Sequence, residues 1–258
     1  KKVLIADTIA AVIDPALSKY TELSSLDAWL CVLGYTYQLY FDFTGYSDMA
    51  VGLGHLFGLR LPQNFNSPYK ALDIADFWRR WHMSLSTFLR DYLYIPLGGN
   101  RCATPMVFRN IMITMLLGGL WHGANWTFII WGCYHGVLLL LYRMTQRWWD
   151  SLPAPVRGAL TFVMVVIGWV IFRSTDLAMA ETLLRAMFSW QPGGGIIGAN
   201  VLMGMLCLAA PIAHLGPNTF ELRHQWSSMT AVGMALLFGF SVFVIYGARS
   251  TPFLYFQF

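Results

Sequence analysis

The chain has 258 residues, of which 57% are hydrophobic and only 12% charged; its formal net charge is +4 and its mean hydropathy is +0.52. Soluble domains carry about 25% charged residues, so this composition argues against a soluble protein and predicts an integral membrane protein. The positive charge does not indicate nucleic acid as a partner, because basic residues occur at most two in a row, between apolar segments.

The first segments combine apolar stretches with charged residues, whose burial in a membrane costs free energy. Residues 1–25 mix the two kinds of residue, which predicts an amphipathic segment at the membrane surface. From Leu26 to Leu59 the chain turns apolar but contains Asp42 and Asp48. Carboxylates in such surroundings need a partner. They could hold a catalytic histidine or a substrate hydroxyl, but a structural contact with a neighbouring helix is the interpretation we favour.

The next predicted element is a helix that begins at Asp73 or Asp76 and ends near Ile95, before Pro96. Four of its polar residues follow at steps of three, four and four, which places them on one face. These residues are Arg79, His82, Ser86 and Arg90. A polar stripe on an otherwise aromatic helix suits the wall of a water-filled channel. The alternative is a helix lying on the membrane with its arginines among lipid phosphates.

His122 lies between two apolar runs, Ile111–Leu120 and Trp126–Tyr142. An ionisable group in such a position is a functional-site hypothesis by default. The glycines around it, Gly118, Gly119 and Gly123, allow a helix break or a close approach of backbones. We therefore predict a bent or re-entrant pair of helices around His122.

The second half of the chain has few ionisable residues inside its apolar segments, and we assign it to scaffold. Its segments are Leu160–Phe172, an amphipathic stretch at Leu177–Trp190, Ile196–His214 and Met229–Tyr246. The excess of arginine in the loops near residues 60–109 and 143–157 predicts that those loops face the cytoplasm. The four cysteines show no metal-binding spacing, so no metal site is expected.

Three strings carry a resemblance to a known family: YFDFTGYSDMAVGLG at residues 40–54, FWRRWHMSLSTFLRDYLYIPLGGNR at 77–101 and GGLWHGANWTFIIWGCYHG at 118–136. They resemble the membrane-bound O-acyltransferase (MBOAT) family, in particular its bacterial polysaccharide branch, which includes alginate O-acetylation proteins. The resemblance implies an all-α, polytopic membrane protein with a central tunnel. We expect one domain over residues 1–258, with a catalytic core at about 26–147 and scaffold helices at about 148–258. Family members are longer at the N-terminal side, so we expect this to be the C-terminal part of a larger protein.

The resemblance also implies a chemistry and a place for it. In the family, the histidine of the Trp-His-Gly motif is regarded as catalytic, which gives that role to His122, with His82 as the second candidate. A neutral histidine can take the proton of an attacking hydroxyl. For substrate binding we assign Arg79, Arg80, Ser86, Arg90, Trp121, Asn125, Asp42 and Asp48. The arginines would bind the phosphates of the donor, although their orienting role in the membrane explains the same charges.

The expected donor is acetyl-coenzyme A or another acyl thioester on the cytoplasmic side, with no bound cofactor. The expected location is the bacterial inner membrane, which the chain crosses several times. The expected partners are the lipid bilayer, periplasmic acetyltransferase proteins and an exported polysaccharide that receives the acetyl group.

Two other functions remain open on the sequence. One is an acyl-group channel or exporter without chemistry of its own. The other is a haem protein, because His122 and His135 lie thirteen residues apart, a spacing that suits two haems on one transmembrane helix. The remaining histidines, His55, His82, His214 and His224, provide no second such pair.

Overall fold

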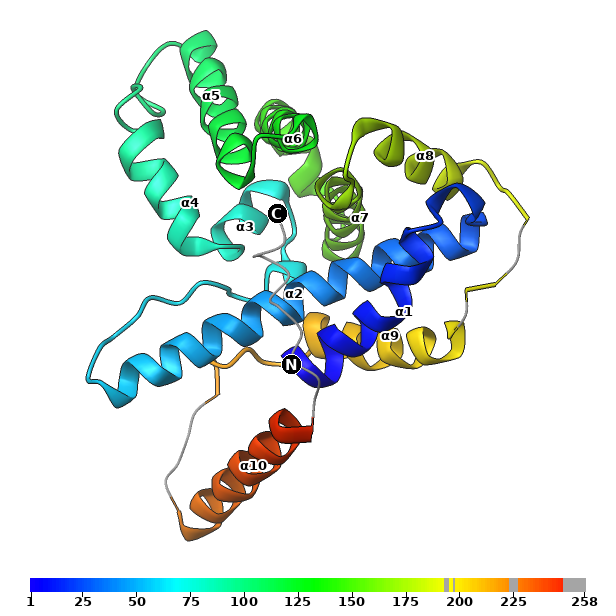
Figure 1. Ribbon diagram of the computed structural model, residues 1–258. Helices are drawn as coiled ribbons and strands as arrows, with labels where there is room; N and C mark the ends of the chain where they lie inside the picture. Colours follow the sequence, from blue (N-terminus) through cyan, green and yellow to red (C-terminus); the bar gives the residue numbers. More distant parts are fainter. Residues whose placement is uncertain (193–194, 197, 223–226, 248–258) are drawn as a thin grey trace.

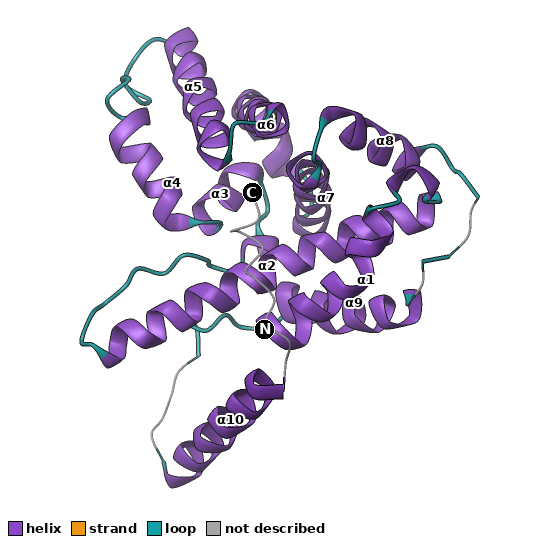
Figure 2. Cartoon of the chain, in the orientation of Figure 1, coloured by secondary structure: helices purple, strands orange, loops and turns teal. Residues whose placement is uncertain are grey.

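The computed structural model describes residues 1–192, 195–196, 198–222 and 227–247. Over these residues the chain is helical and contains no strand (Figures 1 and 2). The all-α prediction is confirmed. His224 and residues 248–258 lie outside the described residues.

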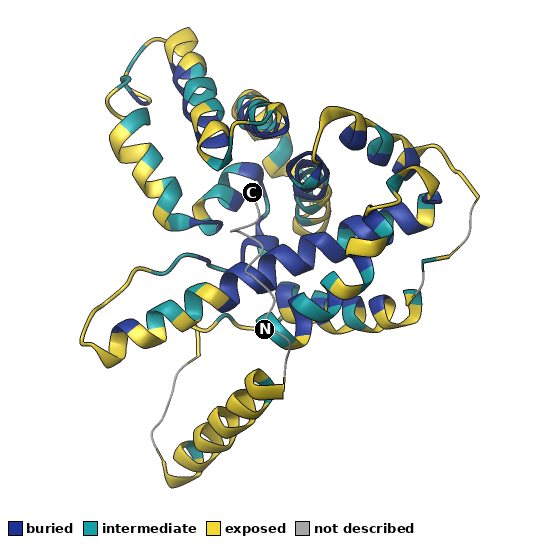
Figure 3. Cartoon of the chain, in the orientation of Figure 1, coloured by how far each residue is buried: buried dark blue, intermediate teal, exposed yellow. Residues whose placement is uncertain are grey.

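The centre of the fold is the long helix α2, Ser25–Leu56. It begins with a reciprocal cap, in which the Asp27 N–H donates to Ser24 Oγ at 3.2 Å and the Ser24 hydroxyl donates to Asp27 Oδ2 at 2.6 Å. Most of α2 from Asp27 to Gly45 is buried (Figure 3). It packs most extensively against η1 (Lys2–Ala6), α1 (Asp7–Leu17), α7 (Ala154–Arg173), α8 (Leu177–Phe188) and α9 (Ala199–His214).

The N-terminal segment is part of this core, so the prediction of a membrane-surface segment is wrong. Ile9 and Ile13 have no exposed surface, and Leu17 is only 3% exposed. These positions repeat every four residues and form the face by which α1 packs on α2 and α9. The pattern predicted an amphipathic helix correctly, but its apolar face binds protein instead of lipid.

The predicted continuous helix over residues 73–95 is also wrong, because it is broken at His82. Asp73 does cap the first part, α3 (Ile74–Arg80), by accepting from the Asp76 N–H at 2.6 Å. His82 then has a left-handed backbone with φ 45° and ψ 54°, a conformation that costs a non-glycine residue about 1–3 kcal/mol. The chain continues as α4 (Met83–Leu89) and the π-helical η4 (Arg90–Tyr94).

Helices α5 (Thr104–His122) and α6 (Trp126–Ser151) form a tight antiparallel pair around residues 123–125. Glycines allow the two backbones to meet: a Cβ on Gly119 would lie 2.2 Å from the Phe128 carbonyl oxygen, and one on Gly132 would lie 2.3 Å from the Met115 carbonyl oxygen. The predicted bend after His122 is confirmed, and His122 is the last residue of α5.

Three described helices are long and apolar enough to cross a membrane: α6, α7 and α10 (Ser228–Gly247). Helix α10 has no buried residue and lies apart from the α2 core in Figure 3. The remaining short helices, η2 (Tyr20–Glu22) and η3 (Pro68–Lys70), are single 3-10 turns.

Candidate active site

His82 and His122 lie at the same small cavity, which we call the connecting cavity. Its volume is about 10 Å³, roughly the space that one water molecule needs. It is lined by Leu39, Phe43, Trp81, His82, His122, Trp131, Trp169 and Phe172. His82, at the break between α3 and α4, and His122, at the end of α5, therefore share an otherwise apolar and aromatic space that fits one small polar group.

The His122 ring is held among aromatic side chains. Its ring centre lies 5.3 Å from that of Trp131 and 5.0 Å from that of Phe172, both edge to face. Gly123 allows this arrangement, because a Cβ there would lie 2.8 Å from the Phe128 ring. The three aromatic rings fix His122 at the end of α5, which is the rigidity that a proton-transfer group needs.

A large cavity opens on one side of His122, and we call it the arginine-lined cavity. Its volume is about 500 Å³, and His122 and Trp131 line both it and the connecting cavity. Its lining includes three arginines and no acidic residue: Arg79, Arg90 and Arg143. Ser86 also lines it and donates to the Trp81 carbonyl at 3.2 Å.

The sequence did not predict Arg143 as a site residue. Its guanidinium donates to Asn100 Oδ1 at 3.0 Å, and the Tyr94 hydroxyl donates to the same oxygen at 2.8 Å. All three residues line the arginine-lined cavity. We had placed Arg143 in a loop, and only its helical register on α6, one turn beyond Leu139, could have indicated that it faces the cavity.

A second cavity, of about 350 Å³, lies on the His82 side, and we call it the hydroxyl-lined cavity. His82 and Phe43 line both it and the connecting cavity. Its polar lining contains no arginine, lysine or carboxylate: Tyr46, Ser47, Asn64, His82, Ser84 and Trp121. Trp121 is 54% exposed, and its ring centre lies 6.2 Å from that of His82 and 5.1 Å from that of His122.

The predicted polar stripe is divided by the break at His82. Arg79, Ser86 and Arg90 line the arginine-lined cavity, whereas His82 faces the other two cavities. Arg90 also pairs with Asp91 at 2.7 Å. Because the backbone is left-handed at His82, this side chain leaves the face that a continuous helix would give it.

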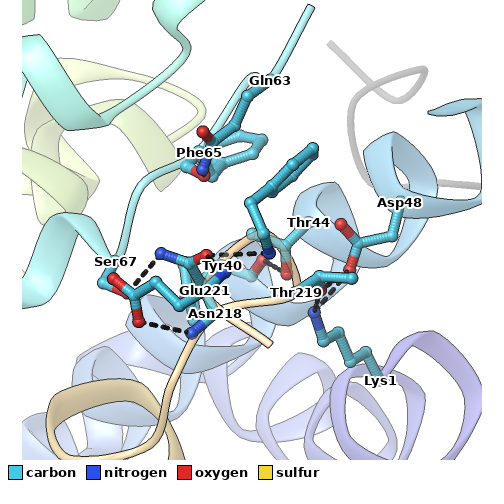
Figure 4. A network of polar contacts seen from close by, with 11 residues as sticks. Lys1, Tyr40, Thr44, Asp48, Gln63, Phe65, Ser67, Asn218, Thr219 and Glu221 are labelled. Atoms are coloured by element: carbon cyan, nitrogen blue, oxygen red, sulfur yellow. Dashed lines mark hydrogen bonds and ion pairs between the residues drawn. The ribbon is translucent and has the colours of Figure 1, made fainter. Parts of the chain in front are cut away.

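Several predicted binding residues have structural contacts instead and line none of these three cavities. Asp42 forms an ion pair with Lys2 at 2.8 Å. Asp48 pairs with Lys1 and accepts from the Thr219 hydroxyl at 2.9 Å, as Figure 4 shows. Both carboxylates thus have the structural contacts that we favoured, although the partners are N-terminal lysines.

Arg80 and Asn125 are likewise placed in local structure. Arg80 pairs with Asp76 at 2.9 Å and donates to the Asn66 carbonyl at 3.2 Å. Asn125 caps α6 by accepting from the Thr127 N–H at 3.1 Å, and it donates to the Thr175 carbonyl at 2.8 Å. Neither residue lines one of the three cavities, and their role in binding substrate stays a prediction.

The spacing argument for haem is wrong, because His122 and His135 are on different helices, α5 and α6. His135 has no exposed surface. Its ring stacks on Phe77 at 6.3 Å and meets Trp78 edge to face at 5.2 Å, and a Cβ on Gly168 would lie 2.7 Å from its Nε2. A haem plane cannot approach this imidazole without displacing those groups.

The fold and site thus define a helical membrane protein with two histidines between two cavities. Residues 9–178 match the family model described as MBOAT, the membrane-bound O-acyltransferase family. The match covers more than half of the chain, and the chain belongs to this family.

Similar curated proteins act on several polymers, according to their names. The chain is 45% identical to the "Probable alginate O-acetylase AlgI" of Pseudomonas putida, over 100% of this chain and 59% of that protein. It is 40% identical to the peptidoglycan O-acetyltransferase of Helicobacter pylori, over 100% of this chain and 54% of that protein. It is 35% identical to the teichoic acid D-alanyltransferase of Bacillus subtilis, over 61% of this chain and 43% of that protein. The chain therefore spans little more than half the length of the first two.

Proposed function

We propose that this protein is a membrane O-acyltransferase that moves an acetyl group from a cytoplasmic thioester to hydroxyls of an exported polysaccharide. The observation that carries the proposal is the arrangement of His122 and His82 at one small cavity, whose lining shares His122 with the arginine-lined cavity and His82 with the hydroxyl-lined cavity. Family membership and the names of the similar acetyltransferases support the same reaction type.

His122 is the proposed general base. It takes the proton of the acceptor hydroxyl as the hydroxyl oxygen attacks the thioester carbonyl. The tetrahedral intermediate then breaks its carbon–sulfur bond, and the imidazolium returns the proton to the departing thiolate. Such proton transfer by a positioned side chain contributes about 10²–10⁴-fold in rate.

The arginine-lined cavity is the proposed donor site. A cavity of about 500 Å³ lies in the range of small-molecule sites. Its guanidinium groups suit phosphates, which arginine binds through charge-assisted hydrogen bonds. Acetyl-coenzyme A carries phosphates at one end and the thioester at the other, so its phosphates would bind near Arg143 and Arg79 with the thioester towards His122.

The hydroxyl-lined cavity is the proposed acceptor site. A neutral sugar needs hydrogen-bonding hydroxyls and amides together with a flat apolar surface, and Ser47, Asn64 and Trp121 offer these groups. In this proposal the acceptor cavity faces the periplasm, the protein lies in the bacterial inner membrane with several passes, and periplasmic acetyltransferase proteins complete delivery to the polymer.

A channel or exporter without chemistry is the second candidate. Two cavities joined by a constriction would also suit conduction of a small group. The connecting cavity favours chemistry, since its two imidazoles enclose a space of about one water molecule.

The test is ester-linked acetate on exported polysaccharide in a strain that lacks the native gene. The strain carries the full-length wild type, His122→Ala or His55→Ala at matched membrane levels; His55 is exposed and lines none of the three cavities. We expect His122→Ala to lose at least about 10²-fold of the acetate, with polymer yield unchanged and His55→Ala normal. Normal acetate in His122→Ala would contradict the proposed role of His122.

A further inference from the structure

The loop that contains Asn64 and Asn66 is joined to both sides of the helix break at His82. The Met83 N–H donates to the Asn64 carbonyl at 2.9 Å, and the Asn66 N–H donates to the Arg80 carbonyl at 2.9 Å. The loop before α3 thus supplies backbone partners for groups that the interrupted helix cannot pair. The hydrogen bond between the Met83 N–H and the Asn64 carbonyl places the Asn64 side chain beside the His82 ring.

The hydrogen bonds of Asn64 show which end of its amide faces His82. The Ser84 backbone N–H lies 3.2 Å from Asn64 Oδ1, and the Ser84 hydroxyl donates to the same atom at 2.9 Å. A backbone N–H can only donate, so the atom that it meets must be the amide oxygen. The amide nitrogen is at the other end, 3.4 Å from Ser47 Oγ.

The same oxygen determines where the proton of His82 lies. His82 Nδ1 is 3.1 Å from Asn64 Oδ1. An amide oxygen only accepts hydrogen bonds, so Nδ1 donates to it and carries the proton; two lone pairs would otherwise face each other. The Ser84 hydroxyl also lies 3.4 Å from Nδ1, but its shorter contact, at 2.9 Å, is the one that it donates to Asn64 Oδ1. In the neutral imidazole, Nε2 then has the lone pair.

We propose that Asn64 is a positioning residue that holds His82 as its Nδ1–H tautomer, so that Nε2 accepts the hydrogen bond of the acceptor hydroxyl and directs that hydroxyl towards His122. The step to the acceptor rests on the proposed function. The tautomer itself rests only on the contacts of Asn64. The same contacts stabilise the left-handed backbone of His82 by tying Ser84 and Met83 to the preceding loop.

A purely structural role for Asn64 makes a different prediction. Asn64 also caps the start of α4 through the Ser84 N–H, and loss of a cap costs about 0.5–2 kcal/mol of stability. Such a loss would lower the amount of folded protein. It would change neither the tautomer nor the rate per folded molecule.

The experiment uses the full-length protein in membranes, with histidine labelled with ¹³C and ¹⁵N, and solid-state NMR to read the tautomer. The His82 signal is identified by its loss in His82→Gln. The variants are Asn64→Ala, which lacks the acceptor, Asn64→Asp, which keeps an acceptor oxygen, and Gln63→Ala as the control. Gln63 is the neighbouring residue, and its amide donates to the Phe65 carbonyl at 2.6 Å. Acetyl transfer per folded molecule is measured on the same samples.

We expect Nδ1–H for wild type, Gln63→Ala and Asn64→Asp, and a shift of the proton towards Nε2 in Asn64→Ala. Misplacement of a reacting group costs about 10²-fold in rate, so Asn64→Ala should lose turnover on that scale, while the KM for the donor stays the same. Asn64→Asp should recover most of the rate at alkaline pH. The acid limb of the pH–rate profile of Asn64→Asp should move to higher pH. The reason is that a carboxylate beside His82 favours the imidazolium, which cannot accept a hydrogen bond.

An Nε2–H tautomer in the wild type would overturn the proposal, as would an unchanged tautomer and rate in Asn64→Ala. If Asn64→Ala does not fold, Asn64→Asp provides the test. An Nδ1–H tautomer in Asn64→Asp together with a wild-type pH profile of acetyl transfer would also contradict the proposal. A wild type that transfers no acetyl group would refute the proposed function, and the NMR signal would still decide the tautomer.

Discussion

The two cavities beside the histidines differ in charge. The arginine-lined cavity has three guanidinium groups in its lining, whereas the lining of the hydroxyl-lined cavity contains no arginine, lysine or carboxylate. The first suits a ligand with phosphates, and the second suits a neutral ligand with many hydroxyls. The small connecting cavity shares His122 with the first and His82 with the second, and in the proposed function two chemically different substrates would meet there.

The largest expected effect comes from the close contact of α5 and α6, which positions His122. Gly119→Val places a side chain against the Phe128 carbonyl, where even a Cβ would be 2.2 Å away. Overpacking costs typically about 1–3 kcal/mol, and separation of α5 from α6 would also displace His122. We expect a lower unfolding temperature and a loss of acetyl transfer that an excess of donor or of acceptor does not restore.

The control for this substitution is Gly204→Val on α9, where nothing lies within 4 Å of the added Cβ. Unfolding temperature by intrinsic tryptophan fluorescence and acetyl transfer are measured for both variants. A Gly119→Val protein with wild-type stability would show that the close contact of α5 and α6 is dispensable.

A smaller effect, confined to the KM for the donor, is expected at the arginines. Arg143→Ala removes a cation from the proposed donor site and should raise the KM for acetyl-coenzyme A by about tenfold, since a hydrogen bond to a charged group is worth roughly 1.5–3 kcal/mol. The KM for acetyl-pantetheine, which lacks the nucleotide phosphates, should not change.

Arg157→Ala is the matched control for Arg143→Ala. Arg157 pairs with Asp150 at 3.0 Å and lines neither large cavity. An equal rise of KM for both donors in Arg143→Ala would mean that the arginine does not bind phosphate. It would contradict the assignment of the arginine-lined cavity to a ligand with phosphates.

The sequence predicted the features that depend on local pattern. The break after His122 followed from two apolar runs and the glycines between them, and Asp73 was an expected helix cap. The membrane class followed from composition, and the all-α fold was implied by the family resemblance. These features are local because each is determined by residues within a few turns of the same segment.

The sequence could not predict features that depend on distant partners. The helix over residues 73–95 is broken because residues 64–66 bind both sides of His82, and periodicity within the helix contains no sign of that loop. The partners of Asp42 and Asp48 are lysines more than 35 residues away. The sequence therefore predicted that Arg79, Ser86 and Arg90 share a face, but not that His82 faces other cavities.

The smallest expected effect is at the neutral cavity. Trp121→Ala removes an exposed aromatic surface from the proposed acceptor site, and such a surface contributes about 0.5–1.5 kcal/mol beyond its buried area. The KM for a soluble oligosaccharide acceptor should rise by about three- to tenfold, while the KM for the donor stays constant. Trp126→Ala is the control, because Trp126 is 69% exposed and lines none of the three cavities. A rise confined to the donor KM in Trp121→Ala would reverse the assignment of the two cavities, since Trp121 contacts both histidine rings but lines only the uncharged cavity.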